Sequence, residues 1–380
     1  MNLKYNAIDA DAHVLEPGDL WNKYLESKFK DKAPGLHREA NGKEVFRIDD
    51  NNSVDLGQHS EEAFALAGGI GMREGQGPTG NSYSDGKRGG FDPHHRIPDM
   101  NSEGIDVAFL FPTLGLFLGG IRDAQMAVAS FRAYNRWVRD YCSEYPDRLF
   151  GIAMIPMRSP EDAVAEIKYA SKSLGLRAAM VSPIMDNNRP LHHPDNDPVW
   201  RAAQEHNMPI AVHAAVPKVG VKVLGDDRFT EESGSGSAVK HCAGHMLEMA
   251  SAVFSFVMNR ICDKFPELRV GFMEAGGGWV AGCLDRMDRH FDDIGANDTG
   301  LTLRPSEIFR RQCFISFEPV ERTLPLLAEY IGRTNILWAT DYPHADGFTG
   351  APTMIRKMPM AQDLVKDVLV TGAQRFYGLS

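Results

Sequence analysis

Short apolar runs alternate with longer segments of mixed polarity along most of the chain. In the longer segments apolar residues recur every three or four positions, which is typical of helices packed on a core. Alternation of this kind predicts parallel strands joined by helices. Eight apolar runs are predicted to be strands: Asn6–Ala12, Val107–Phe111, Phe150–Ile155, Ala178–Val181, Pro209–His213, Arg269–Glu274, Cys313–Phe317 and Ile336–Ala339.

Six segments between these runs are predicted to be helices. The longest places Phe131, Tyr134 and Trp137 at helical spacing, and another begins at Pro160 with Ser159 in the N-cap position. The six segments are Ala124–Glu144, Pro160–Leu174, Pro198–His206, Met246–Phe265, Trp279–Phe291 and Leu324–Tyr330. Eight strands with helices between them fit a (β/α)8 TIM barrel better than an open sheet.

Two long stretches interrupt the alternation. Glu39–Pro98 is rich in Gly, Asn, Ser and Asp, and Val216–Val239 directly follows the strand that ends at His213. Both are too long for simple connections, so we expect them to be loops inserted over the C-terminal mouth of the barrel. The sequence therefore predicts one barrel domain over residues 1–380, with insertions at about 39–98 and 216–239.

Composition and charge narrow the class of protein. The formal net charge is −10 and no stripe of Lys and Arg is present, which argues against a nucleic-acid partner. The first residues lack a signal-peptide pattern, and no stretch reaches the roughly 18 uncharged apolar residues of a membrane span. Five scattered cysteines without a Cys-x-x-Cys pair suit buried free thiols in a reducing compartment. We therefore expect a soluble cytoplasmic protein with no membrane partner.

Ionisable side chains stand at the carboxyl ends of four predicted strands. The first strand, in "IDADAHVLEP", closes on Asp9, Asp11 and His13, which alternate and should share one face of the strand. Three such groups at the end of a buried strand are costly unless something compensates them, and a bound metal ion would do so. The other ends carry His213, Glu274 and Asp341. In a barrel these ends converge above the axis.

Each of these residues also has a purely structural interpretation. His213 could be a buried histidine bonded to a carbonyl, and Asp11, His13 or Asp341 could cap a turn. Glu274 could accept hydrogen bonds from the amides of Gly276–Gly278. Each structural interpretation is reasonable for one residue, but chance is a poor explanation for metal-capable groups at all four strand ends. We therefore predict a metal site. Mixed imidazole and carboxylate ligands suit Zn²⁺, Mn²⁺ or Fe²⁺ rather than Ca²⁺.

Several segments together resemble the amidohydrolase-related family, the branch of the amidohydrolase superfamily that includes aromatic-acid decarboxylases. The matching segments are "IDADAHVLEP", "MNSEGIDVAFLFPT", "YPDRLFGIAMIP", "NMPIAVHAA", "KFPELRVGFMEAGGGW" and "ATDYPHAD". The resemblance implies that His13, His213 and Asp341 bind the metal directly. The chain departs from the better-known members twice, with Asp11 in place of a histidine and Glu274 in place of a catalytic histidine.

The extra carboxylates leave the number of ions open at one or two. Asp11, His13, His213, Glu274 and Asp341, with His245, are enough ligands for two metals that share a bridging hydroxide. His245 stands where this branch typically has a histidine, and it lies four positions after His241. Glu16 is a further candidate, as a ligand or as a partner of one. The roles of His241 and His344 stay open.

The leading functional hypothesis is a metal-dependent hydrolase of a small carbonyl compound, an amide, ester, thioester or lactone. Metal-activated water would attack while Asp341 or Glu274 moves the proton, with His245 as a further catalytic candidate. The alternative is a metal-dependent, non-oxidative decarboxylase of an aromatic acid. A hypothesis of another class is a non-catalytic metal-binding barrel. The expected partner is a small-molecule substrate. We also expect a homo-oligomer, namely a dimer.

Overall fold

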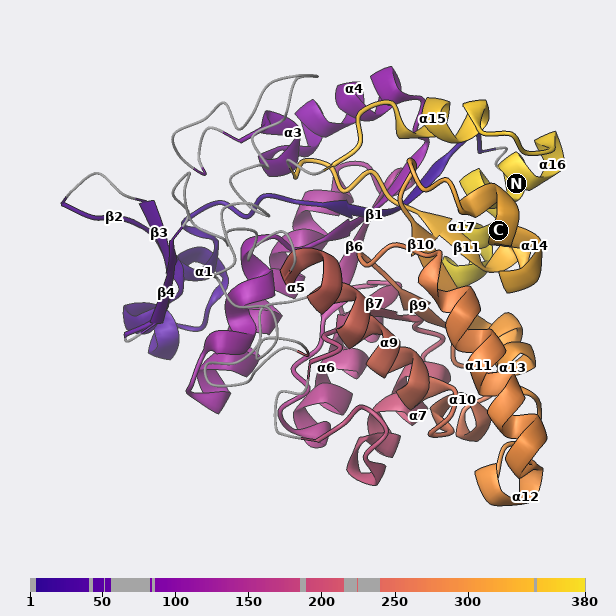
Figure 1. The fold of residues 1–380 in the computed structure, drawn as a ribbon. Helices are drawn as coiled ribbons and strands as arrows, with labels where there is room; N and C mark the ends of the chain where they lie inside the picture. Colours follow the sequence, from indigo (N-terminus) through magenta and orange to yellow (C-terminus); the bar gives the residue numbers. More distant parts are fainter. Residues whose placement is uncertain are drawn as a thin grey trace.

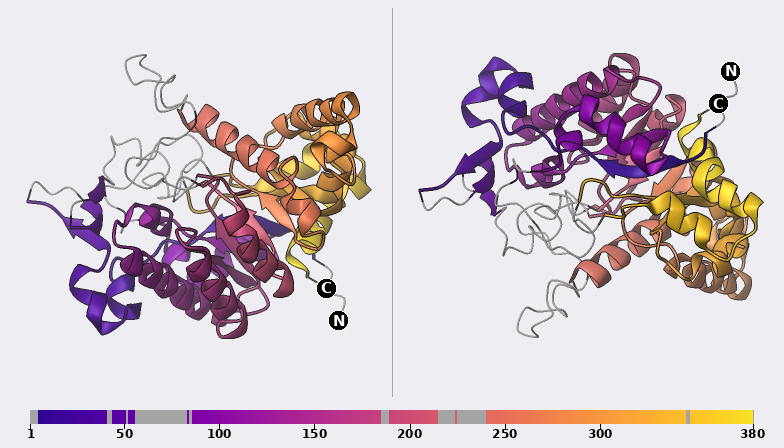
Figure 2. Two further views of the ribbon diagram at one scale, coloured as in Figure 1. Left: turned by 90° about the horizontal axis from the view of Figure 1, so that it is seen from below. Right: turned by 90° about the horizontal axis from the view of Figure 1, so that it is seen from above.

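The structure is a computed structural model. It describes residues 5–40, 44–50, 52–55, 83, 86–184, 189–214, 224, 240–344 and 347–379. Helices surround a core of strands, as the three views in Figures 1 and 2 show. A small separate sheet stands to one side of this assembly (Figure 1).

Eight parallel strands form the core. They pair in chain order, each with the strand that precedes it in the sheet, so every connection is a crossover of the kind that a barrel requires. The strands are β1 (Ile8–His13), β5 (Val107–Phe111), β6 (Leu149–Met154), β7 (Ala178–Val181), β8 (Ile210–Val212), β9 (Val270–Phe272), β10 (Cys313–Phe317) and β11 (Ile336–Trp338). The predicted (β/α)8 TIM barrel is confirmed, and each predicted strand is present within three residues of its expected ends.

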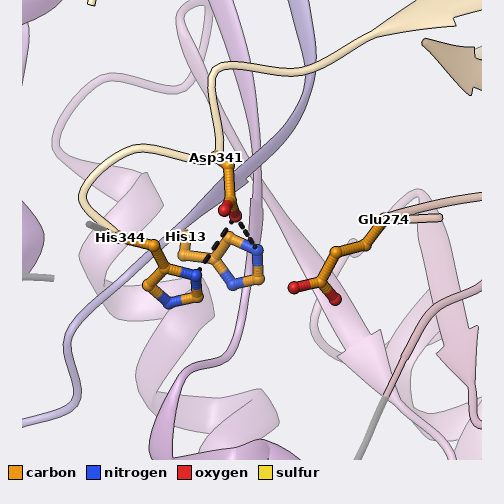
Figure 3. Close-up of side chains that lie close together, drawn as sticks. All are labelled: His13, Glu274, Asp341 and His344. Atoms are coloured by element: carbon orange, nitrogen blue, oxygen red, sulfur yellow. Dashed lines mark ion pairs between the residues drawn. The ribbon is translucent and has the colours of Figure 1, made fainter. Parts of the chain in front are cut away.

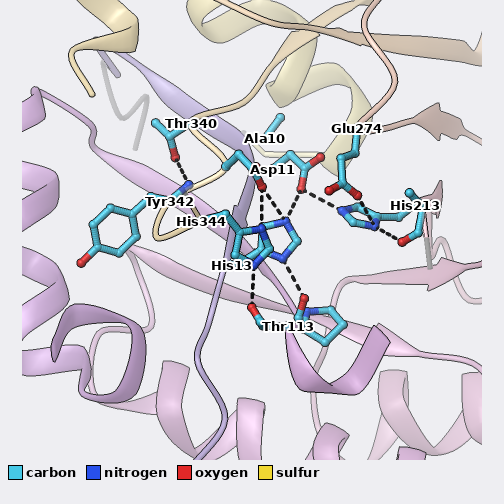
Figure 4. A network of polar contacts seen from close by, with 12 residues as sticks. Ala10, Asp11, His13, Thr113, His213, Glu274, Thr340, Tyr342 and His344 are labelled. Atoms are coloured by element: carbon cyan, nitrogen blue, oxygen red, sulfur yellow. Dashed lines mark hydrogen bonds and ion pairs between the residues drawn. The ribbon is translucent and has the colours of Figure 1, made fainter. Parts of the chain in front are cut away.

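The barrel closes where the segment after β11 meets β1. The Asp341 N–H donates to the Asp11 carbonyl at 3.1 Å, and the His13 N–H donates to the Tyr342 carbonyl at 2.7 Å. Asp9 adds a side-chain link, because its carboxylate accepts hydrogen bonds from the Thr340 amide at 3.1 Å and from the Thr340 hydroxyl. Figure 4 shows Asp11, Thr340 and Tyr342 around this closure, which we call the seam.

Because its carboxylate is bound to Thr340, Asp9 is not available to a metal ion as Asp11 and His13 are. The register of β1 against β5 shifts between Asp9 and Ala12, so strict alternation does not hold along this strand. Burial raises the pKa of Asp9 to about 7, against the opposing effect of its hydrogen bonds to Thr340. The prediction that three groups share a single compensating ion is wrong for Asp9, because Thr340 already satisfies it.

Helices cover the outside of the barrel. The longer ones follow the strands: α4 (Pro93–Glu103), α5 (Ala124–Ser143), α6 (Pro160–Lys172), α7 (Asp197–Glu205), α9 (His245–Phe256), α11 (Trp279–Ile294), α13 (Pro305–Gln312) and α14 (Leu324–Ile331). Shorter ones are α1 (Leu20–Tyr24), α3 (Arg88–Phe91), α10 (Ile261–Lys264), α12 (Ala296–Thr299), α15 (Ala351–Lys357), α16 (Gln362–Lys366) and α17 (Gly372–Tyr377). Turns of 3-10 or π helix are η1 (Ser27–Lys32), η4 (Leu114–Gly120), η5 (Pro194–Asn196), η7 (Lys240–Gly244), η8 (Arg333–Asn335) and η9 (Asp367–Thr371).

One predicted helix is wrong as a single element. The segment Met246–Phe265 consists of α9 and α10, separated by Arg260 in the left-handed region with φ 71°. Apolar residues on both sides of the break, such as Val257 and Ile261, are fully buried in the same core. The apolar spacing therefore continues through the break, and the sequence pattern does not detect it.

The two predicted insertions lie partly outside the described residues. Within Glu39–Pro98 the structure places two of the three strands of an antiparallel sheet, formed by β2 (Gly35–Arg38), β3 (Glu44–Asp49) and β4 (Asn52–Asp55), together with α3. Strands of four to six residues are too short to give a sustained period, so the sequence showed none. Of Val216–Val239 only Leu224 is described, and the single-domain organisation stays a prediction.

The described residues also test two expectations from composition, the absence of a membrane span and the presence of buried free thiols. In this part of the chain we find no helix that combines the length and apolar character needed to cross a bilayer. All five cysteines are described and unpaired; Cys142, Cys262 and Cys313 are buried, whereas Cys242 is exposed. Free thiols are thus confirmed, but the expectation that all of them are buried is wrong for Cys242.

The seam gives a test of stability. We expect Thr340→Val to lower the free energy of unfolding by about 1.5–3 kcal/mol, because it removes a hydrogen bond to a buried carboxyl group. Thr340→Ser keeps the hydroxyl and should stay close to the wild type. Urea unfolding of the three proteins, with a chelator present, checks this expectation. Equal stability of the Val and Ser variants would show that the Asp9–Thr340 contact contributes little.

Candidate metal centre

Five ionisable side chains converge at the carboxyl ends of the barrel strands. Asp11 and His13 close β1, and His213 follows β8 directly. Glu274 and Asp341 lie two and three residues beyond β9 and β11. Both stand in the left-handed backbone region, with φ of 53° and 54°, which is uncommon for residues other than glycine. Such conformations concentrate at functional sites, where the surrounding structure holds them.

The side chains approach one another closely (Figures 3 and 4). His13 Nε2 lies 3.0 Å from Asp341 Oδ1 and 3.7 Å from Asp11 Oδ1. His213 Nε2 lies 3.5 Å from the same Asp11 oxygen, and His213 Nδ1 lies 3.2 Å from Glu274 Oε2. Two atoms that bind one ion at about 2.0–2.2 Å are roughly 3–4 Å apart, so the three separations from the histidine Nε2 atoms suit a shared ion.

Backbone carbonyls fix the tautomers of both histidines. His13 Nδ1 lies 2.7 Å from the Pro112 carbonyl, and His213 Nδ1 lies 2.6 Å from the Ala214 carbonyl. A carbonyl can only accept, so each Nδ1 carries the hydrogen. The lone pair of each neutral ring is then on Nε2, which faces the carboxylates. This arrangement, with one nitrogen anchored and the other turned inward, is that of metal-binding histidines.

The inward-facing atoms lack hydrogen-bond partners. Among the described residues, the buried atoms without a partner include Asp11 Oδ1, His13 Nε2, His213 Nε2, Glu274 Oε2 and Asp341 Oδ1. Buried polar atoms are normally satisfied, so five unsatisfied atoms around one point need a common explanation. All five are oxygen or imidazole donors of the kind that bind Zn²⁺, Mn²⁺ or Fe²⁺. The donor set therefore fits a divalent metal ion.

Two overlapping groups of donors meet at His13. In the described part of the chain, one group consists of Asp11, His13 and His213, and the other of His13, Glu274, Asp341 and His344. In each group the donor atoms lie within 4.8 Å of one another. His13 has a single inward nitrogen, so the two groups cannot each use it for a separate ion.

The pKa values of Glu274 and Asp341 shift in opposite directions. Burial raises the pKa of Glu274, and the charges of Asp341 and Asp11 help to bring it to about 8 against the effect of His213. Burial also acts on Asp341, but His344 and His13 outweigh it and hold its pKa below the usual range. Glu274 thus favours the protonated form near neutral pH, whereas Asp341 favours the carboxylate.

The histidines also respond to their surroundings. Burial lowers the pKa of His213, but the charges of Glu274 and Asp11 outweigh it and raise the pKa to about 10. Burial and the neighbouring His344 lower the pKa of His13, against the carboxylates of Asp341 and Asp11. A metal ligand must be a neutral imidazole, so binding to His213 releases a proton and metal affinity falls as the pH drops.

His344 completes the group on the Asp341 side. Its Nδ1 lies 3.1 Å from Asp341 Oδ1, and its ring stacks on His13 with 4.0 Å between the ring centres. Its Nε2 lies 2.8 Å from the Thr113 hydroxyl, which itself donates to the Val14 carbonyl at 2.7 Å. The single hydroxyl hydrogen is therefore used, so His344 Nε2 must be the donor to Thr113. The hydrogen bond to Thr113 thus orients the ring with Nδ1 facing Asp341.

Glu16 is buried but lies in neither donor group. Its carboxylate accepts hydrogen bonds from the amides of Thr113, Leu114 and Gly115 at 2.8–3.2 Å, at the start of η4. Burial raises the pKa of Glu16, against the opposing effect of these hydrogen bonds. The structure thus places Glu16 as an anchor for the loop that carries Thr113.

The structural alternative for Glu274 is not supported. The amides of Gly277 and Gly278 donate to the carboxylate of Glu321, at 2.9–3.2 Å, and not to Glu274. A Cβ at Gly277 would lie 2.2 Å from the Phe317 ring, so this position needs a glycine. Glu321 thus holds the turn, and Glu274 stays available for the centre.

His245 is a member of neither donor group. It is the first residue of α9. The side chain of His241 lies outside the described residues. Sequence reasoning did not identify Thr113 or Thr340 as parts of the site, because each acts through a contact distant in the chain. A single sequence carries no signal for such contacts.

Comparison with known proteins identifies the family. The model of the family described as Amidohydrolase matches residues 8–379, so the chain belongs to that family. Over 293 residues, 76% of this chain and 77% of the relative, it is 23% identical to 2-amino-3-carboxymuconate-6-semialdehyde decarboxylase of Dictyostelium discoideum. It is 25% identical to gamma-resorcylate decarboxylase of Rhizobium radiobacter over 284 residues, 68% of this chain and 80% of the relative.

Solved structures share the fold. A dihydroxybenzoic acid decarboxylase from Polaromonas sp. JS666, with bound manganese and the inhibitor 2-nitroresorcinol, superimposes with a TM-score of 0.69 at 16% identity. The match covers 99% of this chain and 98% of that one. The resemblance to the branch with aromatic-acid decarboxylases is thus confirmed.

The expectation of a hydrolase is wrong. The curated relatives are decarboxylases, which are lyases, and the manganese-bound structural neighbour is a decarboxylase as well. The sequence identified ligand types that suit a divalent metal, but the same ligands can serve water activation or the binding of a carboxylate substrate. The choice between these two uses depends on the substrate, which the ligands do not reveal.

Metal binding provides the test of the centre. We expect Asp11→Ala and Asp341→Ala to lose most of the bound Mn²⁺ of the wild type, because each removes an inward oxygen. Glu166→Gln is the control, since this buried carboxylate pairs with Arg132 and Asn135 instead. Elemental analysis after dialysis against Mn²⁺ measures the content. Full Mn²⁺ in both alanine variants would contradict the assignment.

Proposed function

We propose that this member of the Amidohydrolase family is a metal-dependent, non-oxidative decarboxylase of an aromatic acid. The observation that carries the proposal is the arrangement of two carboxyl groups in one site. Asp341 Oδ1 lies 3.0 Å from the inward nitrogen of His13, and Glu274 stands beside these donors with a side chain that is 17% exposed. The raised pKa of Glu274 agrees with an acid, and the lowered pKa of Asp341 agrees with a metal ligand. The decarboxylases among its relatives support the same reaction class.

The reaction needs a proton donor. An aromatic carboxylate is converted to the arene and carbon dioxide when the ring carbon that bears the carboxylate takes up a proton. The carbon–carbon bond then breaks, its electron pair stays in the ring, and carbon dioxide leaves. One proton is consumed in each turnover and is replaced from solvent. General acids of this kind contribute about 10²–10⁴-fold in rate.

Glu274 is the residue we assign to this step. Its side chain is 17% exposed, whereas those of His13 and His213 are fully buried, so a substrate above the barrel can reach it. Its burial keeps the proton in place near neutral pH. Glu274 therefore takes the part that a histidine plays in the better-known members that the sequence resembles.

The remaining donors would hold the metal. We assign Asp11, His13, His213 and Asp341 to a single ion, because His13 is common to both donor groups and has one inward nitrogen. A bound divalent ion supplies positive charge for the carboxylate and a neighbouring oxygen of the substrate. Manganese is the ion we favour, since it is bound in the structural neighbour.

The substrate class follows from the chemistry of the step. A hydroxyl group beside the carboxylate donates electron density to the carbon that must accept the proton, and it offers a second oxygen to the ion. We therefore propose a benzoic acid with a hydroxyl at the 2-position, in line with the dihydroxybenzoic acid named for the neighbour. A homodimer and a cytoplasmic location stay predictions.

The direct test follows solvent hydrogen and solvent oxygen into the aromatic product. With Mn²⁺ and a panel of 2-hydroxybenzoic acids we expect equal amounts of arene and carbon dioxide. In deuterated water one deuterium should appear at the carbon that lost the carboxylate. We expect Glu274→Gln to lower kcat by about 10²–10⁴-fold while Mn²⁺ content stays unchanged, because the amide has no proton to give.

Two outcomes would contradict the proposal. Uptake of solvent oxygen into the aromatic product, followed with ¹⁸O water, would indicate hydrolysis. Unchanged turnover of Glu274→Gln would remove Glu274 from the proton step. Glu166→Gln serves as the matched control, because it makes the same change at a buried carboxylate that pairs with Arg132 and Asn135 and belongs to neither donor group.

A further inference from the structure

Arg96 is a buried cation beside the metal centre that the proposed reaction does not use. It lies in the first part of α4, and only 1% of its surface is exposed. Its neighbours in the sequence are His94 and His95, both exposed, and in the chain alone it resembles a solvated helix residue. A buried guanidinium costs several kcal/mol unless its surroundings compensate it. Its contacts therefore show what this position requires.

Those contacts join the two sides of the seam. Arg96 Nη1 donates to the carbonyl of His13 at 2.7 Å. The guanidinium also lies over the ring of Tyr342, with Cζ 4.3 Å from the ring centre. Since the His13 amide donates to the Tyr342 carbonyl at 2.7 Å, the three residues form a closed triangle. One corner is the metal-capable His13, and another is the residue that follows Asp341.

Two further residues contact Tyr342 from outside the triangle. The Tyr342 hydroxyl donates to the carboxylate of Asp99, and Lys87 Nζ lies 5.0 Å from the centre of the Tyr342 ring. The positive charge of Arg96 also lowers the pKa of Asp9, which burial raises, and so favours the carboxylate that accepts from Thr340. Arg96 thus contacts the His13–Tyr342 link of the seam and influences the Asp9–Thr340 link.

We propose that Arg96 is a positioning residue for the metal centre, which fixes the backbone of His13 and Tyr342 so that His13 and Asp341 face the same ion. The inference rests on the metal centre of the proposed function, but not on the reaction. Lysine cannot replace the guanidinium fully, because it lacks the plane that stacks on Tyr342. Residues that orient metal ligands typically change metal affinity by about 10–100-fold when replaced.

A cavity next to Arg96 gives the inference a specific test. It measures about 80 Å³ and is lined by Arg96, Asp9, Thr340, Tyr342 and His344, and towards the surface by residues that include the exposed Ser102. Truncation of Arg96 would enlarge this space by the volume of the lost side chain. A small guanidinium ion from solution could then occupy the position of the missing group.

The experiment measures Mn²⁺ affinity by titration, below the unfolding temperature of every variant. We expect the Kd for Mn²⁺ to rise about 10–100-fold in Arg96→Met and Arg96→Ala, and by less in Arg96→Lys. Millimolar guanidinium chloride should lower the Kd of Arg96→Ala towards that of the wild type. It should not affect Arg96→Met, whose side chain fills the space.

Arg132→Met is the matched control. Arg132 pairs with the buried carboxylate of Glu166 at 2.7 Å, so its loss destabilises the fold in the same general way. It should leave the Kd for Mn²⁺ unchanged, with or without guanidinium. A loss of affinity caused only by lower stability would appear equally in both methionine variants.

The outcomes separate this inference from the proposed function. If the wild type does not bind Mn²⁺, the metal centre itself is contradicted. If the wild type binds Mn²⁺ and the Arg96 variants bind it with the same Kd, only the role of Arg96 is overturned. If Arg96→Met and Arg96→Ala do not fold, an unchanged Kd in Arg96→Lys overturns it.

Discussion

The hydrogen bonds at the seam are the constraint on which the rest of the site depends. Asp9 and Thr340 are 331 positions apart, yet the side chain of one holds the backbone of the other. The amides of His13 and Asp341 are bound across the same seam. Without this closure the first and last strands would be the free edges of an open sheet. The donors on β1 would then lie apart from Asp341, and there would be no centre.

The same closure explains why neighbouring aspartates have different roles. Asp9 and Asp11 are both buried near the end of one strand. Asp9 is satisfied by Thr340 and lies within the influence of Arg96, so its charge is compensated by the protein. Asp11 Oδ1 has no such partner and faces two imidazole nitrogens. Burial is equally costly for both, and only the partners decide which one is left for an ion.

The distinction between hydrolase and decarboxylase has a related cause. Both reactions require a cation that binds oxygen, and both require a group that moves a proton. The ligand types at the strand ends therefore indicate a metal without indicating the bond that breaks. The choice between the reactions depends on the substrate. Burial raises the pKa of Glu274, and His344 and His13 lower that of Asp341, and such a pair of carboxyl groups suits either reaction.

The sequence by itself determined the order and type of the core elements and the residues that could bind a metal. Apolar runs such as Val107–Phe111 and Cys313–Phe317 are local signals, and a barrel brings their carboxyl ends to one place whatever the loops do. Only the tertiary structure decided three hydrogen bonds. Thr340 donates to Asp9, Thr113 orients His344, and Glu321 accepts from the amides of the glycine turn. The contact of Arg96 with the His13 carbonyl is of the same kind. Each depends on a contact between segments far apart in the chain, and the free energy of such a contact leaves no periodicity in the residues on either side.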